Sequence, residues 1–576
     1  MTMPSKRRSS FVLARLGGLG VLGLLLGLAP APARAWDPST THQGMLEAGA
    51  TRSALHLRWM DASELERGLF SDLRIDPDRL DPTQRRELAL TMVESHADVG
   101  ARPLGGPGSC PSADAPPSTQ LFCIDQDVWQ QSAIGWLRLG MVAEVTPVAR
   151  QVHHFLDREH PESATWSDPE LPAATLRQRQ ARSNGEPSAG VLTSTNFAGK
   201  SSSAIAWLDD TSDPLAPPQT FAHLQLASTA PTRAERDHHL ALALMGVGAL
   251  IHVIQDLGVP AHARGDATAF FSPLSPAPGD RGLPLQEFVR FEFGRRDLPG
   301  VAGGIPTTAP SGVPLTDTLR GHVLGDANYE GLATLASTRF FSESSLPPPR
   351  FLELVLSPEA AAQALLGDQP TIDPVEVEGA ILSPWPSDRG YLLSPTGRAL
   401  SAYDTDLDGR IRLYLDETVF REQANSLVPA SVDVTRSLLD LLWPAWPSMR
   451  VSGKRATLTI PATWTGGELI AYVESDRGDR KQTSKLALTP GADLDVDLPE
   501  LDPAKREQGE RVVLVLLASR EPGPPIVLEH VIGAKSSSVN PTRPTPANPA
   551  DPTSPTEPPA EGEPALIEPF PLDDRP

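Results

Sequence analysis

The chain has 576 residues, of which 60 are proline and 45 are glycine, and its formal net charge at pH 7 is −22. This length permits several domains, since a typical domain has about 100–200 residues. The acidic balance repels polyphosphate backbones and argues against a protein that binds nucleic acid through a basic surface.

Residues 1–35 have the pattern of a secretory signal peptide. Three basic residues at 6–8 precede an apolar run over 11–28, and Ala33-Arg34-Ala35 supplies a small-x-small cleavage site. Cleavage there makes Trp36 the mature N-terminus, and it removes five basic and no acidic side chains, so that the formal charge becomes −27. We therefore expect a secreted or periplasmic protein; an uncleaved membrane anchor is the alternative.

The two cysteines, Cys110 and Cys123, lie in a segment rich in proline and serine. Export to an oxidising compartment predicts a disulfide between them. A metal site formed by the two cysteines is the alternative.

The segments with helical periodicity fall between residues 36 and 447. They are 41–60, 82–96, 128–145, 233–257, 286–295 and 419–442, and loops rich in proline and glycine separate them. We therefore predict a mainly α domain over 36–447, with a cleft built from the long loops.

A short stretch at the end of the most apolar helical segment carries three potential metal ligands. His252 and Asp256 stand one helical turn apart on one face, and Gly258 and Pro260 end the helix so that His262 can turn back toward them. A lone buried histidine is usually a packing residue, but a buried carboxylate needs a partner because its desolvation costs several kcal/mol. The residue types and their spacing indicate hydrolytic zinc chemistry.

An acidic motif follows further along the chain. Asp404, Asp406, Asp408 and Gly409 match the first positions of an EF-hand calcium loop, but Leu415 occupies the place of the bidentate glutamate. Calcium binding is therefore the weaker interpretation, and a solvated acidic turn before a helix is the expected one.

The pattern changes after residue 447. Short β-branched or alternating runs at 456–460, 468–473, 484–488 and 511–517 are separated by turn residues, which predicts a small β-sandwich over 448–533. Residues 534–576 consist mostly of Pro, Thr, Glu and Ala, and we expect this tail to be disordered.

The string His-x3-Asp-Leu-x-x-Pro-x-His at 252–262, in a mature chain that begins with Trp36, resembles the zinc-dependent phospholipase C and S1/P1 nuclease superfamily. The resemblance implies an all-α enzyme with three zinc ions, held by His, Asp and Glu side chains and by the amino and carbonyl groups of the N-terminal tryptophan. It covers residues 36–342, or 36–442 at its widest, but not the β domain or the tail.

Further ligands follow from the resemblance residue by residue. A histidine soon after the tryptophan is matched by His42, and a His-Phe-x-Asp string by His154, with His153 as the alternative alignment. An acidic ligand ahead of it is matched by Glu144, which is otherwise an ordinary charge at a helix end. The resemblance implies three ion sites, namely Glu144, His154, His252 and Asp256; Trp36, His42 and Asp256; and His262 with Glu287. Glu144 and Asp256 are the catalytic carboxylates in this interpretation.

The third ion site departs from the family pattern. Glu287 fits the family's glutamate, but Leu283 stands where a histidine is expected. This site is predicted to be weak or vacant unless another pair replaces the histidine, and His322 with Asp326 has the required helical spacing.

The resulting function is metal-assisted hydrolysis of a phosphodiester. Zinc lowers the pKa of bound water from 15.7 toward about 7 and neutralises charge on phosphoryl oxygens. Phospholipid headgroup esters are the preferred substrate, because the sequence has no cluster of basic residues with interleaved aromatics that would suit nucleic acid. We expect the protein to act at a membrane surface and to have no stable protein partner. A single-strand nuclease and a non-catalytic secreted metal-binding protein are the alternatives.

Overall fold

The structure, a computed structural model, describes residues 41–62, 65–80, 88, 123–124, 129–145, 150, 153–157, 160–163, 203–266, 284–295, 312–368 and 370–532. Trp36, Cys110 and most of the helix predicted at 82–96 lie outside these residues, as does the side chain of Cys123. The cleavage site, the disulfide and the disordered tail therefore stay predictions.

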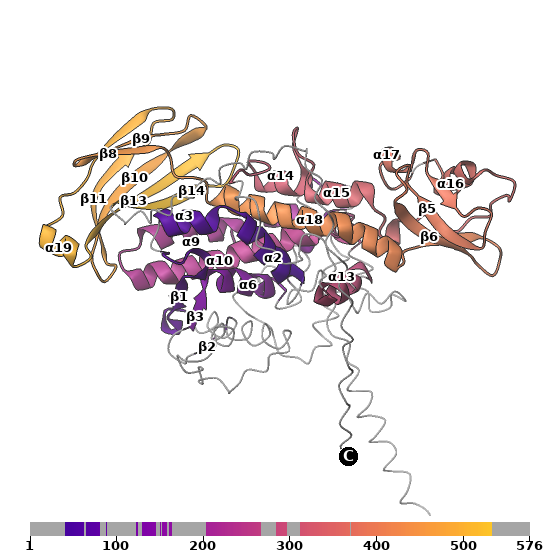
Figure 1. Ribbon diagram of the computed structural model, residues 1–576, viewed down its shortest axis with the longest axis horizontal. Coiled ribbons are helices and arrows are strands. Elements are labelled where there is room, and N and C mark those ends of the chain that lie inside the picture. The colour runs from indigo at the N-terminus through magenta and orange to yellow at the C-terminus, as the bar shows by residue number, and fades with distance from the viewer. Residues whose placement is uncertain are drawn as a thin grey trace, which may run out of the picture. The chain divides into compact units, whose positions relative to one another are not determined.

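Helix α10 (Arg233–Asp256) is the central element of the helical region (Figure 1). Thr232 and Glu235 form a capping box at its start, and its second half is buried throughout. The helix packs against α6 (Ala133–Ala143), α9 (Pro217–Thr229) and α18 (Glu417–Leu442). Among the described residues it alone is long and apolar enough to cross a membrane, but 78% of its apolar window is buried in the protein, as in the core helix of a soluble protein.

Two glycines let the backbones of α6 and α10 touch. A Cβ atom at Gly140 would lie 2.0 Å from the carbonyl oxygen of Met245, and one at Gly248 would lie 2.0 Å from that of Leu137. No side chain fits at either position, so the two helices lie closer than ordinary helix packing allows. This contact fixes the end of α6 beside the ligand-bearing half of α10.

The remaining helices and the first sheet surround this core. The helices are α2 (Thr41–Arg52), α3 (Leu55–Ala62), α8 (Ala204–Trp207), α11 (Pro260–Ala263), α13 (Pro284–Arg295), α14 (Leu319–Leu324) and α15 (Leu332–Arg339), with 3-10 turns at Gly68–Phe70, Pro77–Arg79 and Glu343–Ser345. A small antiparallel sheet has the order β1 (Asp72–Ile75), β3 (Trp129–Ser132), β2 (Cys123–Ile124). The segment predicted as one helix at 128–145 therefore begins as a strand, because residues 129–132 pair with β1 before Ser132 caps α6.

Residues 341–415 form a small unit with its own hydrophobic core, which the prediction of a mainly α region over 36–447 did not include. It contains α16 (Pro358–Leu366), α17 (Pro374–Val377) and an antiparallel sheet of β4 (Ile381–Ser383), β5 (Arg389–Leu393), β6 (Ala399–Thr405) and β7 (Ile411–Tyr414). Its strands are short and follow turn residues closely, so their alternation is weak in the sequence. We call this unit the small sheet unit.

The acidic motif is the turn between β6 and β7, not a turn that leads into a helix. Asp406 Oδ1 accepts hydrogen bonds from the backbone N–H groups of Asp408 and Arg410, and Asp404 pairs with Arg412 at 2.8 Å. Protein donors thus engage Asp404 and Asp406, and the geometry is that of a hairpin loop with Gly409 at φ 83°. The EF-hand interpretation lacks structural support, and we do not propose calcium at Asp404, Asp406 and Asp408.

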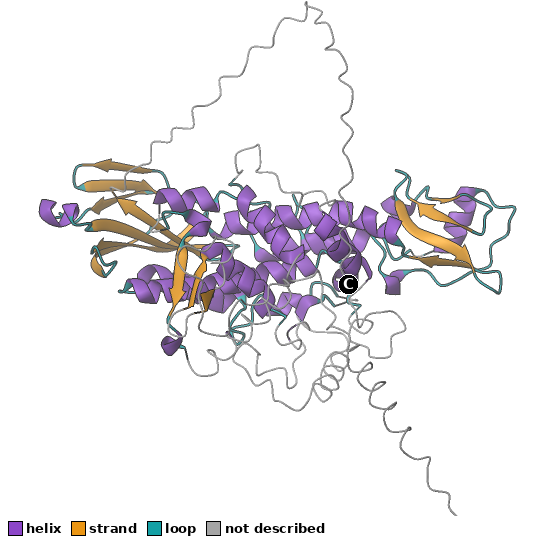
Figure 2. Cartoon of the chain, turned by 60° about the horizontal axis from the view of Figure 1, so that its bottom comes forward, coloured by secondary structure: helices purple, strands orange, loops and turns teal. Residues whose placement is uncertain are grey.

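The C-terminal strands form two packed antiparallel sheets, as predicted for a helical region followed by a β region (Figure 2). One sheet has the order β11 (Arg480–Ala487), β10 (Trp464–Glu474), β13 (Arg511–Arg520), β14 (Ile526–Ile532), and the other has β12 (Asp493–Asp497), β9 (Arg455–Thr459), β8 (Met449–Ser452). The short helix α19 (Pro503–Glu507) precedes β13. Side chains such as Leu458 and Leu514, one from each sheet, share a single core.

A buried ion network joins α10 to the larger sheet. Glu474 on β10 is fully buried and accepts hydrogen bonds from Arg236 of α10 at 3.1 Å, from Arg480 at 2.8 Å and from Arg511 at 2.6 Å. Because removal of one partner leaves buried charges uncompensated, such a network is costly to break.

Substitution Glu474→Gln should lower the free energy of unfolding by about 3 kcal/mol, since three guanidinium groups lose their shared carboxylate. Urea unfolding would measure the loss. The matched control is Glu468→Gln on the same strand, where the partly exposed pair with Lys485 should contribute less than about 1 kcal/mol. Equal effects of the two substitutions would contradict this account.

Glu343 gives the fold a pH dependence. Its Oε1 atom is buried without a hydrogen bond, and burial raises the pKa of Glu343 to about 7, with the charge of Asp266 acting in the same direction. Because the folded pKa lies above the ordinary value of 4.5, the stabilisation is complete below pH 4.5 and is lost as the pH rises through 7.

The unfolding free energy should therefore fall by about 2–3 kcal/mol between pH 5 and pH 8 through this residue. Glu343→Gln should remove that part of the pH dependence in denaturant titrations at the two pH values. Glu359→Gln, at an exposed position of α16, is the control. An unchanged pH dependence in Glu343→Gln would rule out Glu343 as its source.

Candidate metal centre

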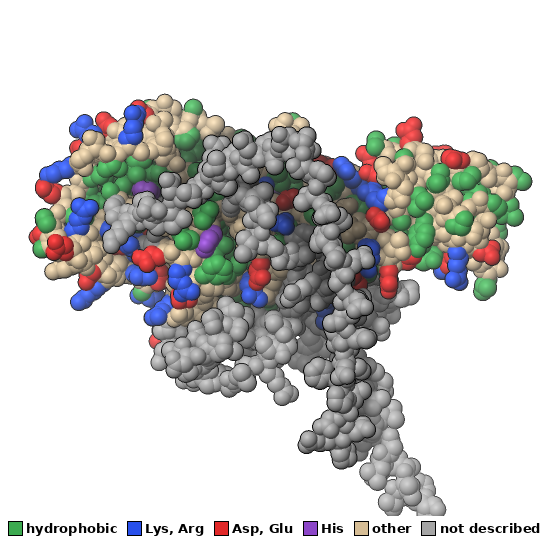
Figure 3. All heavy atoms as spheres, viewed as in Figure 1, with side chains coloured by type: hydrophobic (Ala, Val, Ile, Leu, Met, Phe, Trp, Pro, Cys, Tyr) green, Lys and Arg blue, Asp and Glu red, His purple; other side chains and the backbone are tan. Residues whose placement is uncertain are grey.

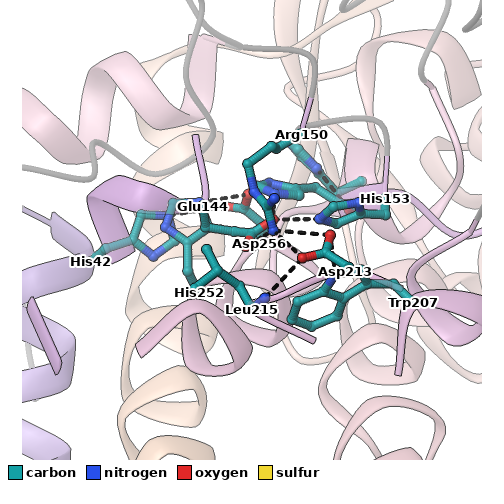
Figure 4. A network of polar contacts seen from close by, with 11 residues as sticks. His42, Glu144, Arg150, His153, Trp207, Asp213, Leu215, His252 and Asp256 are labelled. Carbon is teal, nitrogen blue, oxygen red and sulfur yellow. Dashed lines mark hydrogen bonds and ion pairs between the residues drawn. The ribbon is translucent and has the colours of Figure 1, made fainter. Parts of the chain in front are cut away.

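Four of the sequence-predicted ligands, His42, Glu144, His252 and Asp256, lie close together (Figure 4), and His154 contacts Asp256 beside them. His42 lies in the first turn of α2, His252 and Asp256 lie on the last turns of α10, Glu144 is the C-cap residue of α6, and His154 lies in a short 3-10 turn. All five side chains are fully buried. In the described residues, two groups of possible ligands have atoms within 4.8 Å of one another, namely His42, His252 and Asp256, and Glu144, His153 and His154.

In the first group, a nitrogen atom of His42 lies next to a carboxylate oxygen of Asp256. Gln255 donates its amide N–H to Thr435 Oγ1 at 2.8 Å, which leaves its Oε1 to accept from His42 Nδ1 at 2.7 Å. If Nδ1 carries the only ring proton, the lone pair of His42 Nε2 faces Asp256 Oδ1, only 3.0 Å away. Two facing acceptors need a cation between them, either a proton or a metal ion.

His252 strengthens the argument for a metal ion. Its ring stacks on His42 with centroids 3.9 Å apart, and neither ring nitrogen has a hydrogen bond, although Nε2 lies 3.3 Å from Asp256 Oδ2. Burial and the neighbouring His42 lower the pKa of His252 to about 3, so the imidazole is neutral and its lone pair is available. A buried imidazole whose ring nitrogens make no hydrogen bond is costly, and a bound cation lowers that cost.

The second group is joined to the first by His154. Its Nδ1 lies 2.5 Å from Asp256 Oδ2, and its Nε2 lies 3.5 Å from Glu144 Oε1. The same Glu144 oxygen contacts His153 Nε2, while the His153 ring stacks on Trp207. The geometry therefore allows either histidine to act as the ligand beside Glu144, because both face the same carboxylate oxygen.

Arg150 holds the other side of the Glu144 carboxylate. This fully buried side chain donates from Nη2 to Glu144 Oε2 at 3.0 Å and to Asp213 at 2.8 Å, and Asp213 also accepts from Trp207 Nε1 at 3.2 Å. Burial alone would raise the pKa of Glu144, but Arg150 and His153 outweigh it and hold that pKa well below its ordinary value. Glu144 is therefore suited to holding a cation and poorly suited to accepting a proton.

His262 lies beside these groups but is not part of either. Its Nδ1 donates to the carbonyl oxygen of His154 at 3.0 Å, its ring stacks on Phe155, and its Nε2 lies 3.3 Å from the amide nitrogen of Gln286. Burial lowers the pKa of His262 to about 4. Glu287 follows Gln286 on α13, but its side chain and Leu283 lie outside the described residues. The third ion site therefore stays a prediction.

The prediction that His322 and Asp326 could replace the missing histidine of the third ion site was wrong. His322 is saturated by Thr318 and Ser437, with both contacts at 2.7 Å, and Asp326 accepts from Thr316 and from backbone N–H groups. Helix α14 ends at Leu324, and Gly325 has a φ of 91°, so the two residues do not share a helical face.

Sequence reasoning missed several residues that orient this site. Gln255 is one of the unspecified positions of the His-x3-Asp string, Arg150 belongs to no motif, and Asp213 lies 63 residues from Arg150. His153 was noted only as an alignment alternative. Its sequence position beside His154 was the one clue available.

Comparisons with known proteins add little to this geometry. No protein-family model and no curated protein matches the sequence. Among solved structures, the alpha toxin from Clostridium absonum is similar over 87% of this chain and 96% of that chain, with 10% sequence identity and a TM-score of 0.24. A similarity this distant does not establish a common fold.

Proposed function

We propose that this chain is a zinc-dependent phosphodiester hydrolase that acts on phospholipid headgroup esters. The observation that carries the proposal is the continuous set of buried ligands from His42 through Asp256 and His154 to Glu144, in which imidazole nitrogens and carboxylate oxygens face one another. Such a set is costly without cations and well matched to a metal with nitrogen and oxygen ligands.

The residues divide between two ion positions. His42, His252 and Asp256 would hold one ion, and Glu144 with His153 or His154 would hold the other, with Asp256 positioned to serve both through its two oxygens. Ions bound there would supply a hydroxide from coordinated water at neutral pH and neutralise phosphoryl charge. Gln255 fixes the His42 tautomer, and Arg150 fixes the Glu144 carboxylate, so that the lone pairs are already aimed before an ion arrives.

Export belongs to the same proposal. If the signal peptide is cleaved after Ala35, the new amino group of Trp36 lies six residues before His42 and can complete the first ion position. The third position, with His262 and Glu287, adds an ion only if other groups replace the missing histidine.

Phospholipid is preferred over nucleic acid on electrostatic grounds. The formal charge of −27 after cleavage opposes a polyanionic substrate, while a zwitterionic headgroup carries no net charge to repel. The same metal chemistry would also serve a single-strand nuclease, which is the second candidate.

The metal content of the purified protein tests the proposed ligands. The purified mature protein should contain at least two zinc ions per chain by elemental analysis. His252→Gln should lose about one ion per chain, because it removes a ligand with no other partner. The control is His322→Gln, a buried histidine outside the site, which should keep the full metal content. A wild-type protein without zinc after growth in zinc would overturn the function and the ligand set together.

The second prediction concerns the reaction. The zinc-loaded protein should release the phosphorylated headgroup and diacylglycerol from phosphatidylcholine, and Asp256→Asn should lower kcat at least about a thousandfold, since it weakens the carboxylate shared by both positions. Single-stranded DNA serves as the competing substrate. Release of nucleotides without diacylglycerol would replace the phospholipase by the nuclease.

A further inference from the structure

The small sheet unit exposes large apolar side chains in one loop and at the tip of one hairpin. Phe351, Leu354 and Val355 in one loop are 66%, 70% and 87% exposed, and Leu407 at the tip of the β6–β7 hairpin is fully exposed. Figure 3 shows hydrophobic side chains on the surface of this unit. Single exposed apolar residues are ordinary, but several at adjoining tips call for an explanation.

Backbone and side-chain contacts bring the two tips together. Arg350 and Ile411 exchange both backbone hydrogen bonds, at 3.0 and 2.7 Å, so the loop is paired with the start of β7. The Arg410 guanidinium lies 5.2 Å from the centre of the Phe351 ring, and a Cβ atom at Gly409 would lie 3.9 Å from that ring. Phe351 is therefore the neighbour of the hairpin that carries Leu407.

The loop is anchored so that its apolar residues point outward. Leu352 and Leu356 pack against the core of the small sheet unit, and Leu356 donates its backbone N–H to Glu353 at 3.1 Å, which closes the turn at Leu354 and Val355. The exposed side chains thus stand on a fixed base. We call Phe351, Leu354, Val355 and Leu407 the apolar tip.

We propose that the apolar tip inserts into the surface of a zwitterionic phospholipid bilayer and holds the protein there; this rests on the proposed function, which needs access to lipid. The four side chains are far fewer than the roughly 20–30 residues that each partner contributes to a stable protein interface. Protruding tips suit insertion between lipid headgroups, and guanidinium groups such as Arg350 and Arg410 at their base can contact lipid phosphates.

The charge around the tip selects the kind of lipid. Arg350 and Arg410 are offset by Glu353, Asp406 and Asp408, so the surroundings offer no basic cluster for anionic lipid. Binding should therefore depend on apolar insertion and change little between about 0.05 and 0.5 M salt.

The test measures vesicle binding separately from hydrolysis. The mature chain carrying Asp256→Asn, in which hydrolysis should be at least about a thousandfold slower, is sedimented with phosphatidylcholine vesicles. Leu407→Asp should weaken partitioning roughly tenfold, and Val355→Asp combined with Leu407→Asp roughly a hundredfold. Both positions contact little of the fold, so circular dichroism and thermal unfolding should match the parent. Val451→Asp, at a half-exposed position on β8, is the matched control and should bind as the parent does.

A second readout separates this proposal from the proposed function. In the catalytically intact chain, the tip variants should hydrolyse a short-chain, monomeric phosphatidylcholine at the wild-type rate and lose activity only on vesicles. If the chain does not hydrolyse the monomeric lipid but its vesicle binding depends on the apolar tip, the proposed function is overturned and the proposed membrane contact stands. If the tip variants bind vesicles as the parent does, or if Val451→Asp loses binding equally, the proposed membrane contact is overturned. It is also overturned if the wild-type protein is a dimer and the tip variants are monomers that still bind vesicles.

Discussion

The burial of Asp256 is the constraint on which the rest of the site depends. The carboxylate is fully buried near the end of a helix that is apolar on all sides, and its two oxygens face nitrogen atoms of three histidines from three segments. A carboxylate in such surroundings is stable only with compensating positive charge. Here the histidines lower the pKa of Asp256 against the effect of burial, so that it stays ionised and attracts a cation.

Residues outside the ligand set position the side chains around Asp256. The glycine contact between α6 and α10 brings Glu144 next to the histidines, and the Arg150 and Asp213 pair supplies both a counter-charge and a fixed orientation for that carboxylate. Thr435 of α18 fixes Gln255, which in turn fixes His42. Four helices, α2, α6, α10 and α18, and two loops therefore share in orienting six ligand side chains, which is the arrangement expected of a preorganised metal site.

The sequence predicted the parts of this arrangement that depend on local spacing. His252 and Asp256 share a helical face because they are four residues apart, and α10 and α18 begin and end close to the predicted positions. Contacts between residues far apart in the sequence could not be predicted in this way. Gln255 is 213 residues from His42, and Arg150 contacts Asp213 across 63 residues without any motif. The small sheet unit escaped prediction because its strands are three to seven residues long, and the failure of His322 and Asp326 followed from a helix that ends too early.

The central claim is that metal ions occupy the space between these buried side chains. Anomalous X-ray scattering from crystals of the purified protein, recorded on both sides of the zinc absorption edge, tests it most directly. The account predicts one zinc peak within about 2.0–2.2 Å of His42 Nε2, a His252 nitrogen and an Asp256 oxygen, and a second beside Glu144 Oε1. Density without any zinc peak, with a proton shared between His42 and Asp256, would contradict it.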